Sequence, residues 1–518
     1  MGFEIAVARC IRAFAVPFAL LAMLVLAPGA GAAVFSVTKF TDSADGNCDS
    51  DCSLREAILA ANQLQDPTNR IDLAAGTYRL SIPRDTGRFG NLIGTGVDGN
   101  LAVTRTLTIN GAGKDATIID ARPSPEVPGV DRVLGVTNTG NLTLRDVTIT
   151  GGKTVEFGQG GGIVVLGGAL SISDARVIGN VAEAAGGGIA LGGAGANPPA
   201  SATITRCEIA ENLAGTPPIG GQGGGVLNIQ GTMTIEDSTI RDNTALLSTG
   251  GGIMNIDNQN RPNPEALLTV RRSTIVGNLA GDPEGLAATE GVGGGIYNSG
   301  GLLRLTNSTV TSNEAVPAFV PNFGPLPGTG RGGGVAHQLL FGDDASDGTT
   351  LVNSTIAYNT ALTGSQLYGV ERVNPLFLAN TLIVGGTGAS PNCASPPGEA
   401  GLASVGGGNL SDDASPCGFG QPTDQGDVAD PGLDAGLADN GGPTQTIALL
   451  EGSPAIGGGF AASCGMRDQR GYTRRVPCDI GAFESVPETG ADAATLAALG
   501  TLAVTAGSRR NARQRPTI

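Results

Sequence analysis

The sequence predicts an all-β protein wound as a parallel β-helix, with one short helix near its N-terminus. Residues 160–361 contain six copies of one pattern, each opening with three glycines and an aliphatic residue and then reaching an asparagine. Apolar residues alternate ahead of each asparagine with a period of two, which is the strand period. Strands this short bury their apolar side only against a neighbouring copy, so each copy predicts one stacked coil.

The asparagine of each copy is expected to join a ladder. Coils stack about 4.8 Å apart, so equivalent amides lie within reach of one another. We also expect these asparagines to take the left-handed backbone of a tight corner. The six members are Asn180, Asn212, Asn243, Asn278, Asn313 and Asn359. The glycine triplets fit a corner with positive φ and close coil approach, and they lack the lysine of a phosphate-binding loop.

Residues 1–33 predict a secretory signal, with Arg9 and Arg12 before an apolar stretch and small residues at a cleavage site near Ala33. The apolar stretch, residues 13–26, is short for a membrane span. The formal net charge of −16 argues against nucleic acid or an anionic membrane as a partner. With no Trp and 4% aromatic residues, the composition also counts against a groove that processes sugars.

Residues 34–100 predict the N-terminal cap of the solenoid. Ser53 and Glu56 have the spacing of a capping box. One apolar helix face follows, made of Leu54, Ala57, Ile58 and Ala61. A helix at this place covers the open end of the stack, where unpaired edges invite aggregation. Cys48 and Cys52 flank the cap and predict a short-range disulfide in an exported chain.

An acidic stretch in this cap is the one candidate for a cofactor site, and the cofactor would be calcium. Its oxygen donors crowd ten residues but lack EF-hand spacing, and loop solvation and capping explain them equally well. The residues are Asp42, Asp45, Asn47, Asp49 and Asp51. We assign no cofactor and no metal ligand from the sequence.

The residues from Cys52 to Ala57 read CSLREA. They resemble the hallmark of the CSLREA-domain proteins, which are exported bacterial proteins. The resemblance covers about residues 35–82 and implies a right-handed, single-stranded parallel β-helix of the pectin-lyase-like kind, together with export. It implies no established chemistry. The glycine and asparagine spacing is also similar to the repeats of polymorphic outer-membrane adhesins, with Gly in place of Ala and Ile or Val in place of Phe.

The coils are expected to occupy residues 101–408, with roughly nine to eleven coils in all by the strand pattern. Insertions fall at residues 279–292 and 316–331, after an asparagine, and at 193–201 and 257–266, after a glycine triplet. Loops inserted in a solenoid usually cluster on one side and form its binding face.

Residues 409–485 follow a different pattern that resembles the module called choice-of-anchor Q. The matching motifs are 439–444, 452–456, 468–471 and 479–484, with Gly457 where the module commonly has Asp. The resemblance implies the C-terminal end of the solenoid. Two further disulfides are candidates, although connectivity cannot be read from sequence. They would pair Cys393 with Cys417 and Cys464 with Cys478.

Cys207 remains odd and stands where later copies have serine, which predicts an inward-facing thiol. Residues 486–518 predict a sorting or anchor tail. The motif resembles the sortase signal LPxTG, with Val for Leu, and consists of Val486, Pro487, Glu488, Thr489 and Gly490. An apolar run ending in arginines also fits a retained tail anchor, and a disordered terminus is the third alternative.

For catalysis, the candidates are the pairs Asp343–Asp344 and Asp412–Asp413 and the single His337. Hydrolases need paired carboxylates, and lyases need carboxylates for calcium beside a basic residue. Adjacent aspartates in glycine-rich loops are typical turn formers and point to opposite sides when extended. His337 follows a glycine corner where alanine, tyrosine or asparagine would serve. No catalytic residue is therefore assigned.

The sequence thus favours an exported protein, extracellular or anchored at the cell surface, that acts as a non-enzymatic, adhesin-like binding or structural module. The expected partners are a cell-envelope or extracellular ligand, such as a polysaccharide or a neighbouring cell surface, and the export and sorting machinery. Nucleic acid is not expected, and a membrane is expected only through the tail. The alternative function is a polysaccharide lyase or glycoside hydrolase acting on acidic polysaccharide.

Overall fold

A computed structural model describes residues 33–485, apart from 65–67, 86–92, 193–198, 258–265, 286–287, 322, 339–347, 370–375, 387–389, 397–401, 403–404 and 415–416. The predicted signal up to residue 32 and the predicted tail, with the sorting motif 486–490, lie outside the described residues.

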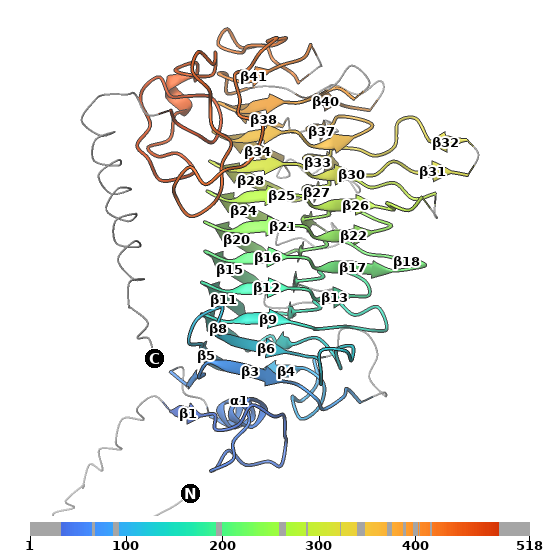
Figure 1. The fold of residues 1–518 in the computed structure, drawn as a ribbon, viewed down its shortest axis with the longest axis vertical. Coiled ribbons are helices and arrows are strands. Elements are labelled where there is room, and N and C mark those ends of the chain that lie inside the picture. The colour runs from blue at the N-terminus through green and yellow to red at the C-terminus, as the bar shows by residue number, and fades with distance from the viewer. Residues whose placement is uncertain are drawn as a thin grey trace, which may run out of the picture.

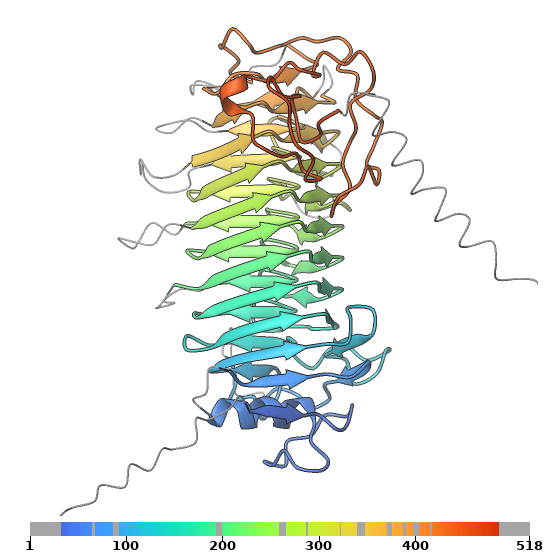
Figure 2. The same ribbon diagram turned by 90° about the vertical axis from the view of Figure 1, so that its left-hand side faces the viewer.

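The chain is wound into a stack of coils, and each coil adds one strand to each of several parallel sheets (Figures 1 and 2). Neighbouring strands in a sheet come from consecutive coils and pair in parallel, with Ile163 opposite Ile189 and Ile172 opposite Ile204. This is the predicted parallel β-helix. Four sheets, here named A to D, run along the rod.

Sheet A contains eleven strands in the described part of the chain. They are β1 (Val34–Ser36), β2 (Arg70–Asp72), β5 (Thr106–Asn110), β8 (Asn141–Arg145), β11 (Ala169–Ser173), β15 (Ser201–Thr205), β20 (Thr232–Glu236), β24 (Leu267–Arg271), β28 (Leu302–Thr306), β34 (Gly348–Val352) and β38 (Phe377–Ala379). Sheet B has eleven strands among the same residues. They are β3 (Gly76–Arg79), β6 (Thr117–Asp120), β9 (Thr148–Thr150), β12 (Arg176–Ile178), β16 (Glu208–Ala210), β21 (Thr239–Arg241), β25 (Thr274–Val276), β29 (Thr309–Thr311), β35 (Thr355–Ala357), β39 (Leu382–Val384) and β41 (Leu410–Ser411).

Sheet C follows the glycine triplets and has ten strands where the chain is described. They are β4 (Leu101–Val103), β7 (Leu134–Val136), β10 (Ile163–Val165), β14 (Ile189–Leu191), β19 (Val226–Ile229), β23 (Ile253–Ile256), β27 (Ile296–Ser299), β33 (Val335–Gln338), β37 (Leu367–Gly369) and β40 (Cys393–Ala394). Sheet D is short and follows the asparagines. Its parallel strands are β13 (Val181–Ala182), β17 (Leu213–Thr216), β22 (Thr244–Leu246), β26 (Leu279–Gly281), β30 (Glu314–Ala315) and β36 (Thr360–Ala361).

The core of the rod consists of stacked aliphatic columns, as the period of two predicts. In the first clear copy Ile163, Ile172 and Val177 point inward from sheets C, A and B, and each is at most 1% exposed. The same cluster of buried residues continues from Cys52 to Cys417. Full burial of each such side chain stabilises the fold by about 1.5–3 kcal/mol, so the stack needs no large aromatic residues.

Two different requirements explain the glycine triplets. The first glycine has positive φ, for example +66° at Gly160. The second and third glycines leave no room for a side chain, because a Cβ at Gly161 would lie 2.5 Å from the carbonyl oxygen of Gly187 in the next coil. Any larger residue would push the coils apart.

The asparagine ladder is present between sheets B and D. Asn243 Nδ2 donates to Asn278 Oδ1 at 2.9 Å, and Asn278 Nδ2 donates to Asn313 Oδ1 at 2.8 Å. The expected backbone conformation of the asparagines is wrong, because the left-handed residue is the one before each asparagine. It is Gly179, Glu211, Asp242, Gly277, Ser312 or Tyr358 in the six copies. That preceding residue reverses the chain, and the asparagine is left to direct its amide inward.

Helix α1 (Leu54–Gln63) covers the first coil. Its capping box is formed by Ser53 and Glu56, and the predicted apolar face is buried. The sequence did not indicate that Arg55 is buried too, where it donates to Asp42 at 2.8 and 2.9 Å. Burial raises the pKa of Glu56, but hydrogen bonds from Ser53, Ser43 and Asp45 outweigh burial and lower this pKa to about 2. In this capping motif the side chains of Ser53, Arg55 and Glu56 therefore all form hydrogen bonds within the protein.

Three disulfides join Cys48 to Cys52, Cys393 to Cys417 and Cys464 to Cys478, the pairings that the sequence made candidates. Cys207 is a free thiol and is buried, as expected. No helix in the described part of the chain is long and apolar enough to span a bilayer.

The C-terminal segment, residues 431–485 with the short 3₁₀ helix η1 (Ala461–Ser463), does more than end the solenoid. It turns back and lies along the outer side of the upper coils (Figures 1 and 2). Gln469 contacts both Thr274 and Thr309 on sheet B, and the amide N–H of Ala482 donates to Thr355 at 2.9 Å. The column of outward-facing threonines on sheet B is thereby covered.

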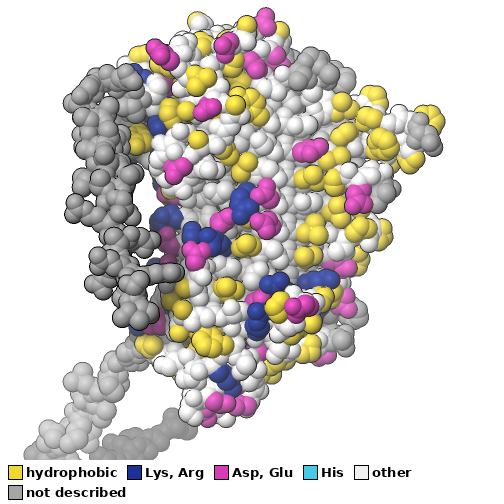
Figure 3. Space-filling model, viewed as in Figure 1, with side chains coloured by type: hydrophobic (Ala, Val, Ile, Leu, Met, Phe, Trp, Pro, Cys, Tyr) yellow, Lys and Arg dark blue, Asp and Glu magenta, His cyan; other side chains and the backbone are white. Residues whose placement is uncertain are grey.

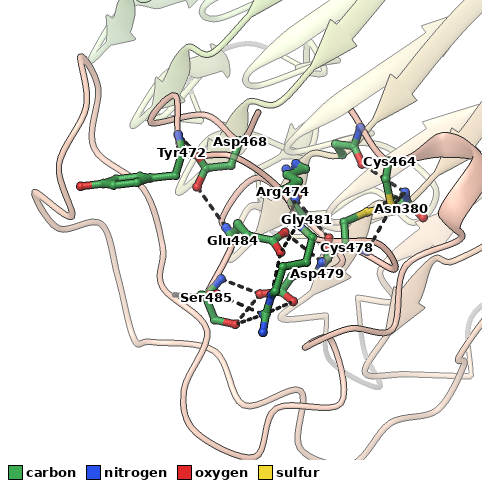
Figure 4. Close-up of polar contacts among 12 residues, drawn as sticks. Asn380, Cys464, Asp468, Tyr472, Arg474, Cys478, Asp479, Gly481, Glu484 and Ser485 are labelled. Atoms are coloured by element: carbon green, nitrogen blue, oxygen red, sulfur yellow. Dashed lines mark hydrogen bonds and ion pairs between the residues drawn. A yellow bond between two sulfur atoms is a disulfide. The ribbon is translucent and has the colours of Figure 1, made fainter. Parts of the chain in front are cut away.

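The motifs in this segment hold its own loops together, as Figure 4 shows. Asp468 accepts from the backbone N–H groups of Tyr472 and Glu484, and Glu484 in turn accepts from Arg474 at 3.3 Å. The side chain of Arg474 is fully buried, and it also donates to the carbonyl oxygen of Gly481. These charged residues bind one another and the backbone, and they thereby stabilise the loops of the C-terminal segment.

Candidate binding face

The insertions predicted at 279–292 and 316–331 lie on one side of the rod. Strand β18 (Ile219–Gly220) forms a hairpin with β17, and β31 (Phe319–Val320) forms one with β32 (Gly324–Pro325). Figure 1 shows both hairpins projecting from the side that carries sheet D. We call this side, with the loops at 153–159, 216–221, 246–249, 281–291 and 316–331, the loop face.

The loop face is rich in exposed apolar side chains. Phe323 is 86% exposed, Phe157 is 65% exposed, and Val155, Phe319 and Leu326 are also exposed. Figure 3 shows hydrophobic side chains gathered along the right-hand side of the molecule, over the region of β17 to β32. Apolar residues that are scattered singly need no explanation, whereas large contiguous apolar patches on proteins are typical of interaction sites.

A hollow of about 430 Å³ lies between three of these loops, those at 216–221, 246–249 and 281–291. Its apolar lining includes Pro217, Pro218, Leu246, Leu247 and Pro283. Its size and lining suit an apolar side chain of a partner better than a sugar, because it offers no aromatic platform. The acidic residues of the loop at 282–284 stand at its edge.

Backbone strain accompanies the exposed residues of the loop face. Glu156 and Phe157 have φ values of +56° and +62°, and Leu247 has +57°. Bulky residues in this region are uncommon and cost on the order of 1–3 kcal/mol each. Several hydrogen bonds hold the loop at 153–159, and two of them position its tip. The Thr154 hydroxyl donates to the Gly158 carbonyl at 2.9 Å, and the Phe157 N–H donates to Glu183 at 2.6 Å.

A second hollow, of about 490 Å³, lies on sheet B beside the C-terminal segment and is lined by charged residues. Figure 3 shows basic and acidic side chains interspersed near the centre of this view. Arg206 pairs with Asp174 at 2.6 Å, and Glu208 pairs with Arg241 at 2.6 Å and with Arg176 at 2.8 Å. No local sequence pattern indicates this charged groove, since these residues become neighbours only through the stacking of coils.

The pKa values of the groove carboxylates do not suit acid catalysis. The hydrogen bond from Arg206 holds the pKa of Asp174 below its usual range. Burial raises the pKa of Glu208, but Arg241 and Arg176 outweigh burial and the net change is downward. A general acid at neutral pH needs a raised pKa, so these carboxylates are ion-pair partners of arginine.

His337 lies inside the stack and not in a cleft. It is 2% exposed and ends a second ladder, formed by Asn228, Asn255 and Asn298 on sheet C. Asn298 Nδ2 lies 3.2 Å from His337 Nδ1, and burial lowers the pKa of His337 to about 4. The signal for this ladder was present in the sequence, because asparagine stands two residues after the aliphatic residue in three of the six glycine motifs.

Of the two aspartate pairs considered for catalysis, Asp412–Asp413 lies in the described part of the chain. Asp412 accepts from Gly385 N–H at 2.9 Å and from Asn392 Nδ2 at 2.7 Å, and Asp413 accepts from Asn392 N–H at 2.8 Å. Both therefore hold the loops of the last coil. The pair Asp343–Asp344 lies outside the described residues.

The acidic stretch of the cap is engaged by the protein itself. Asp42 pairs with Arg55, Asp51 pairs with Lys39, and Asp45 accepts from the N–H of Asn47. Among the described residues, no three His, Cys, Asp or Glu side chains are grouped so that they could hold a metal ion. The calcium hypothesis has no geometric support from these residues.

Comparisons with known proteins found one family model and several solved structures. A family model described as a right handed beta helix region matches residues 132–336. Pectate lyase Pel9A is 14% identical with a TM-score of 0.45, and the match covers 88% of this chain and 98% of that one. The A-module of the Azotobacter vinelandii mannuronan C-5 epimerase AlgE4 is 16% identical, with a TM-score of 0.33 and coverage of 73% and 87%.

Pectin methylesterase from carrot is 12% identical, with a TM-score of 0.32 and coverage of 73% of this chain and 90% of that one. No curated protein matches the sequence. At such identities and TM-scores, the solved structures carry no argument about activity. The right-handed β-helix follows from the strand pairing and the family match, and any function has to be argued from the residues of this chain.

Proposed function

We propose that the protein is an exported binding or structural module, displayed at the cell surface and adhesin-like, that contacts its partner through the loop face. The observation that carries the proposal is the set of exposed apolar side chains on the loop face, where Phe323 is 86% exposed and an apolar hollow is lined by Pro217, Leu246 and other residues of the same face. Exposure of this kind is costly in water unless a partner covers it.

Export is supported by two features. Residues 1–33 have the pattern of a secretory signal, and three disulfides are typical of an oxidising compartment. The motifs that resemble the CSLREA domain and choice-of-anchor Q support display at an envelope, and the motif at 486–490 supports sorting. Each of these is a resemblance of sequence, and surface anchoring is part of the proposal.

The second candidate is a polysaccharide lyase or hydrolase that uses the charged groove on sheet B. The arginines that line the groove favour this candidate, because guanidinium groups suit an acidic saccharide. Its carboxylates, however, are paired with arginine and have lowered pKa values. A binding module requires none of the groups that catalysis would need, so it is the better account of the described residues.

Two measurements test the proposal. Binding of the labelled, purified protein is measured on intact bacterial cells, isolated cell envelopes and immobilised polysaccharides. The double variant Phe157→Ser, Phe323→Ser is expected to lose binding at least tenfold, since two large apolar contacts are removed. Met466→Ser is the matched control, because Met466 is also 86% exposed but lies in the C-terminal segment.

Equal binding by the double variant and the control would refute a role for the loop face. The enzyme alternative is tested on a panel of uronic-acid and neutral polysaccharides. We expect no turnover above a heat-treated sample. Turnover that disappears in Arg241→Met would instead establish the charged groove as an active site.

A further inference from the structure

Arg132 departs from the repeat at the N-terminal end of the clear copies. Strand β7 pairs with β10 so that Leu134 lies opposite Ile163. Arg132 therefore occupies the level of Gly161, the second residue of a glycine triplet. In the later coils this position has no room for a side chain. The first coils thus hold a side chain at this corner, where the later coils have no room for one.

The side chain of Arg132 is completely buried, with 0% of the residue exposed. Its Nε, Nη1 and Nη2 atoms have no hydrogen-bond partner among the described residues. Asp131, next to it, does not pair with the guanidinium. Its carboxylate accepts from the backbone N–H groups of Asn100 at 3.2 Å and of Arg132 at 2.8 Å.

A second cation adds to the positive charge of this corner. Arg84 is also largely buried, and its Nη1 has no partner within the described part of the chain, while its Nη2 donates to Glu156 at 3.2 Å. Burial lowers the pKa of Arg132, Asp131 raises it, and the charge of Arg84 lowers it further. Two guanidiniums thus act on each other and present four nitrogen atoms without partners.

Two other buried arginines do have hydrogen-bond partners, unlike Arg132. Arg55 donates to Asp42 and to the carbonyl oxygens of Gly96 and Gly99. Arg474 donates to Glu484 and to the carbonyl of Gly481. A buried charge without a partner costs several kcal/mol, and buried polar groups in folded proteins nearly always have partners.

We propose that Arg132 and Arg84 form a binding site for a small inorganic anion. The planar edge of a guanidinium, with Nε and one Nη, matches an oxyanion such as sulfate or phosphate, and a halide takes the same donors singly. The burial of Arg132 excludes a polymer or a large organic acid as the ligand. The site adjoins the loop face, since Arg84 contacts Glu156, but a small inorganic anion is a different ligand from the macromolecular partner of the loop face, so the inference goes beyond the proposed function.

The experiment measures urea denaturation of the purified protein with sulfate, phosphate or chloride, at constant ionic strength made up with gluconate, which is too large for the site. Above the dissociation constant, each tenfold rise in anion concentration should raise the free energy of unfolding by about 1.4 kcal/mol. Sulfate and phosphate acting at lower concentration than chloride would identify an oxyanion site, and the reverse order a halide site.

Arg132→Met keeps the volume of the side chain and removes its donors, so the anion dependence should vanish. Arg70→Met is the matched control, because Arg70 is an exposed arginine on the same rod that pairs with Asp72 outside the charged groove, and its anion dependence should equal that of the unmodified protein. Equal anion dependence in Arg132→Met and the unmodified protein would overturn the proposal.

Should Arg132→Met fail to fold, the unmodified protein still decides the matter. Calorimetric titration with sulfate and with chloride should show saturable binding of one anion per chain. The absence of both binding heat and anion-dependent stability would rule the site out. Either result leaves the loop face untouched, since its test depends on Phe157 and Phe323.

Discussion

The single histidine allows a sharp test of the interior polar columns. His337 is the only histidine of the chain, and its Nδ1 lies 3.2 Å from Asn298 Nδ2 and 3.1 Å from the Thr349 hydroxyl. The Asn298 amide is oriented by Asn255, whose Nδ2 donates to Asn298 Oδ1 at 2.8 Å. Asn298 Nδ2 is therefore a donor, and His337 Nδ1 must be unprotonated to accept.

The magnitude and its sign follow from the pKa. Burial lowers the pKa of His337 from 6.5 to about 4, so between these values the unfolded chain binds a proton that the folded chain does not. The contribution of the neutral His337 to the free energy of unfolding is therefore complete above about pH 6.5, and it is lost as the pH falls toward 4. The difference in pKa corresponds to about 3 kcal/mol in the free energy of unfolding.

The variant His337→Asn continues the ladder of Asn228, Asn255 and Asn298 without a titrating group. Urea denaturation from about pH 7 to about pH 4 should show that the variant gains about 3 kcal/mol relative to the unmodified protein as the pH falls. Carboxylates titrate in both proteins and cancel in the difference. Thr349→Val, which keeps the histidine, should retain the pH dependence. Parallel pH profiles, or a native histidine NMR signal titrating near 6.5, would refute the reasoning.

Three further predictions concern the columns and the cap. Asn278→Ala removes a ladder amide and should lower the free energy of unfolding by about 3–5 kcal/mol in urea denaturation. The control Asn141→Ala, at an exposed asparagine, should lower it by less than about 0.5 kcal/mol. Equal losses would contradict a stabilising role of the ladder. Burial raises the pKa of the Cys207 thiol to about 11, so native protein should resist thiol reagents at neutral pH, and Cys207→Ser should cost less than about 1 kcal/mol; fast labelling would place the thiol at the surface. Glu56→Ala should cost about 2–3 kcal/mol at neutral pH, and this loss should shrink as the pH falls from about 4.5 toward 2, because the lowered pKa stabilises only the ionised cap; a pH-independent loss in thermal melts would argue against that origin.

The columns of the solenoid could be predicted because each rests on a residue type at a fixed offset in every copy. Ile163, Gly161 and Asn180 each have five counterparts, and stacking turns that periodicity into contacts. The corner conformation was assigned to the wrong residue for a physical reason. The stack constrains the backbone so strongly that Glu211 and Tyr358 adopt positive φ, although neither residue type favours it.

Other features could not be predicted, because no local pattern encodes them. The return of the C-terminal segment depends on contacts such as that of Gln469 with Thr274, which are 195 residues apart. The charged groove depends on the registry of Arg241 with Glu208, one coil away. The second ladder was visible only in three copies, and His337 interrupts it. A search for polar residues at every offset, and not only at the asparagine, would have found it.

The described residues that look reactive in the sequence lie where chemistry is least accessible. His337 ends a column, Cys207 stands among serines in another, and Asp412 holds a loop of the last coil. A β-helix needs interior polar groups that bond from coil to coil, because the backbone turns at each corner leave donors and acceptors to satisfy. Polar residues that obey the repeat are thus explained by stacking alone. Residues that break it are not, and among the described residues these include the exposed Phe157 and Phe323 and the unpaired guanidinium of Arg132. The departures from the repeat, and not its conserved-looking columns, are therefore where binding should be sought.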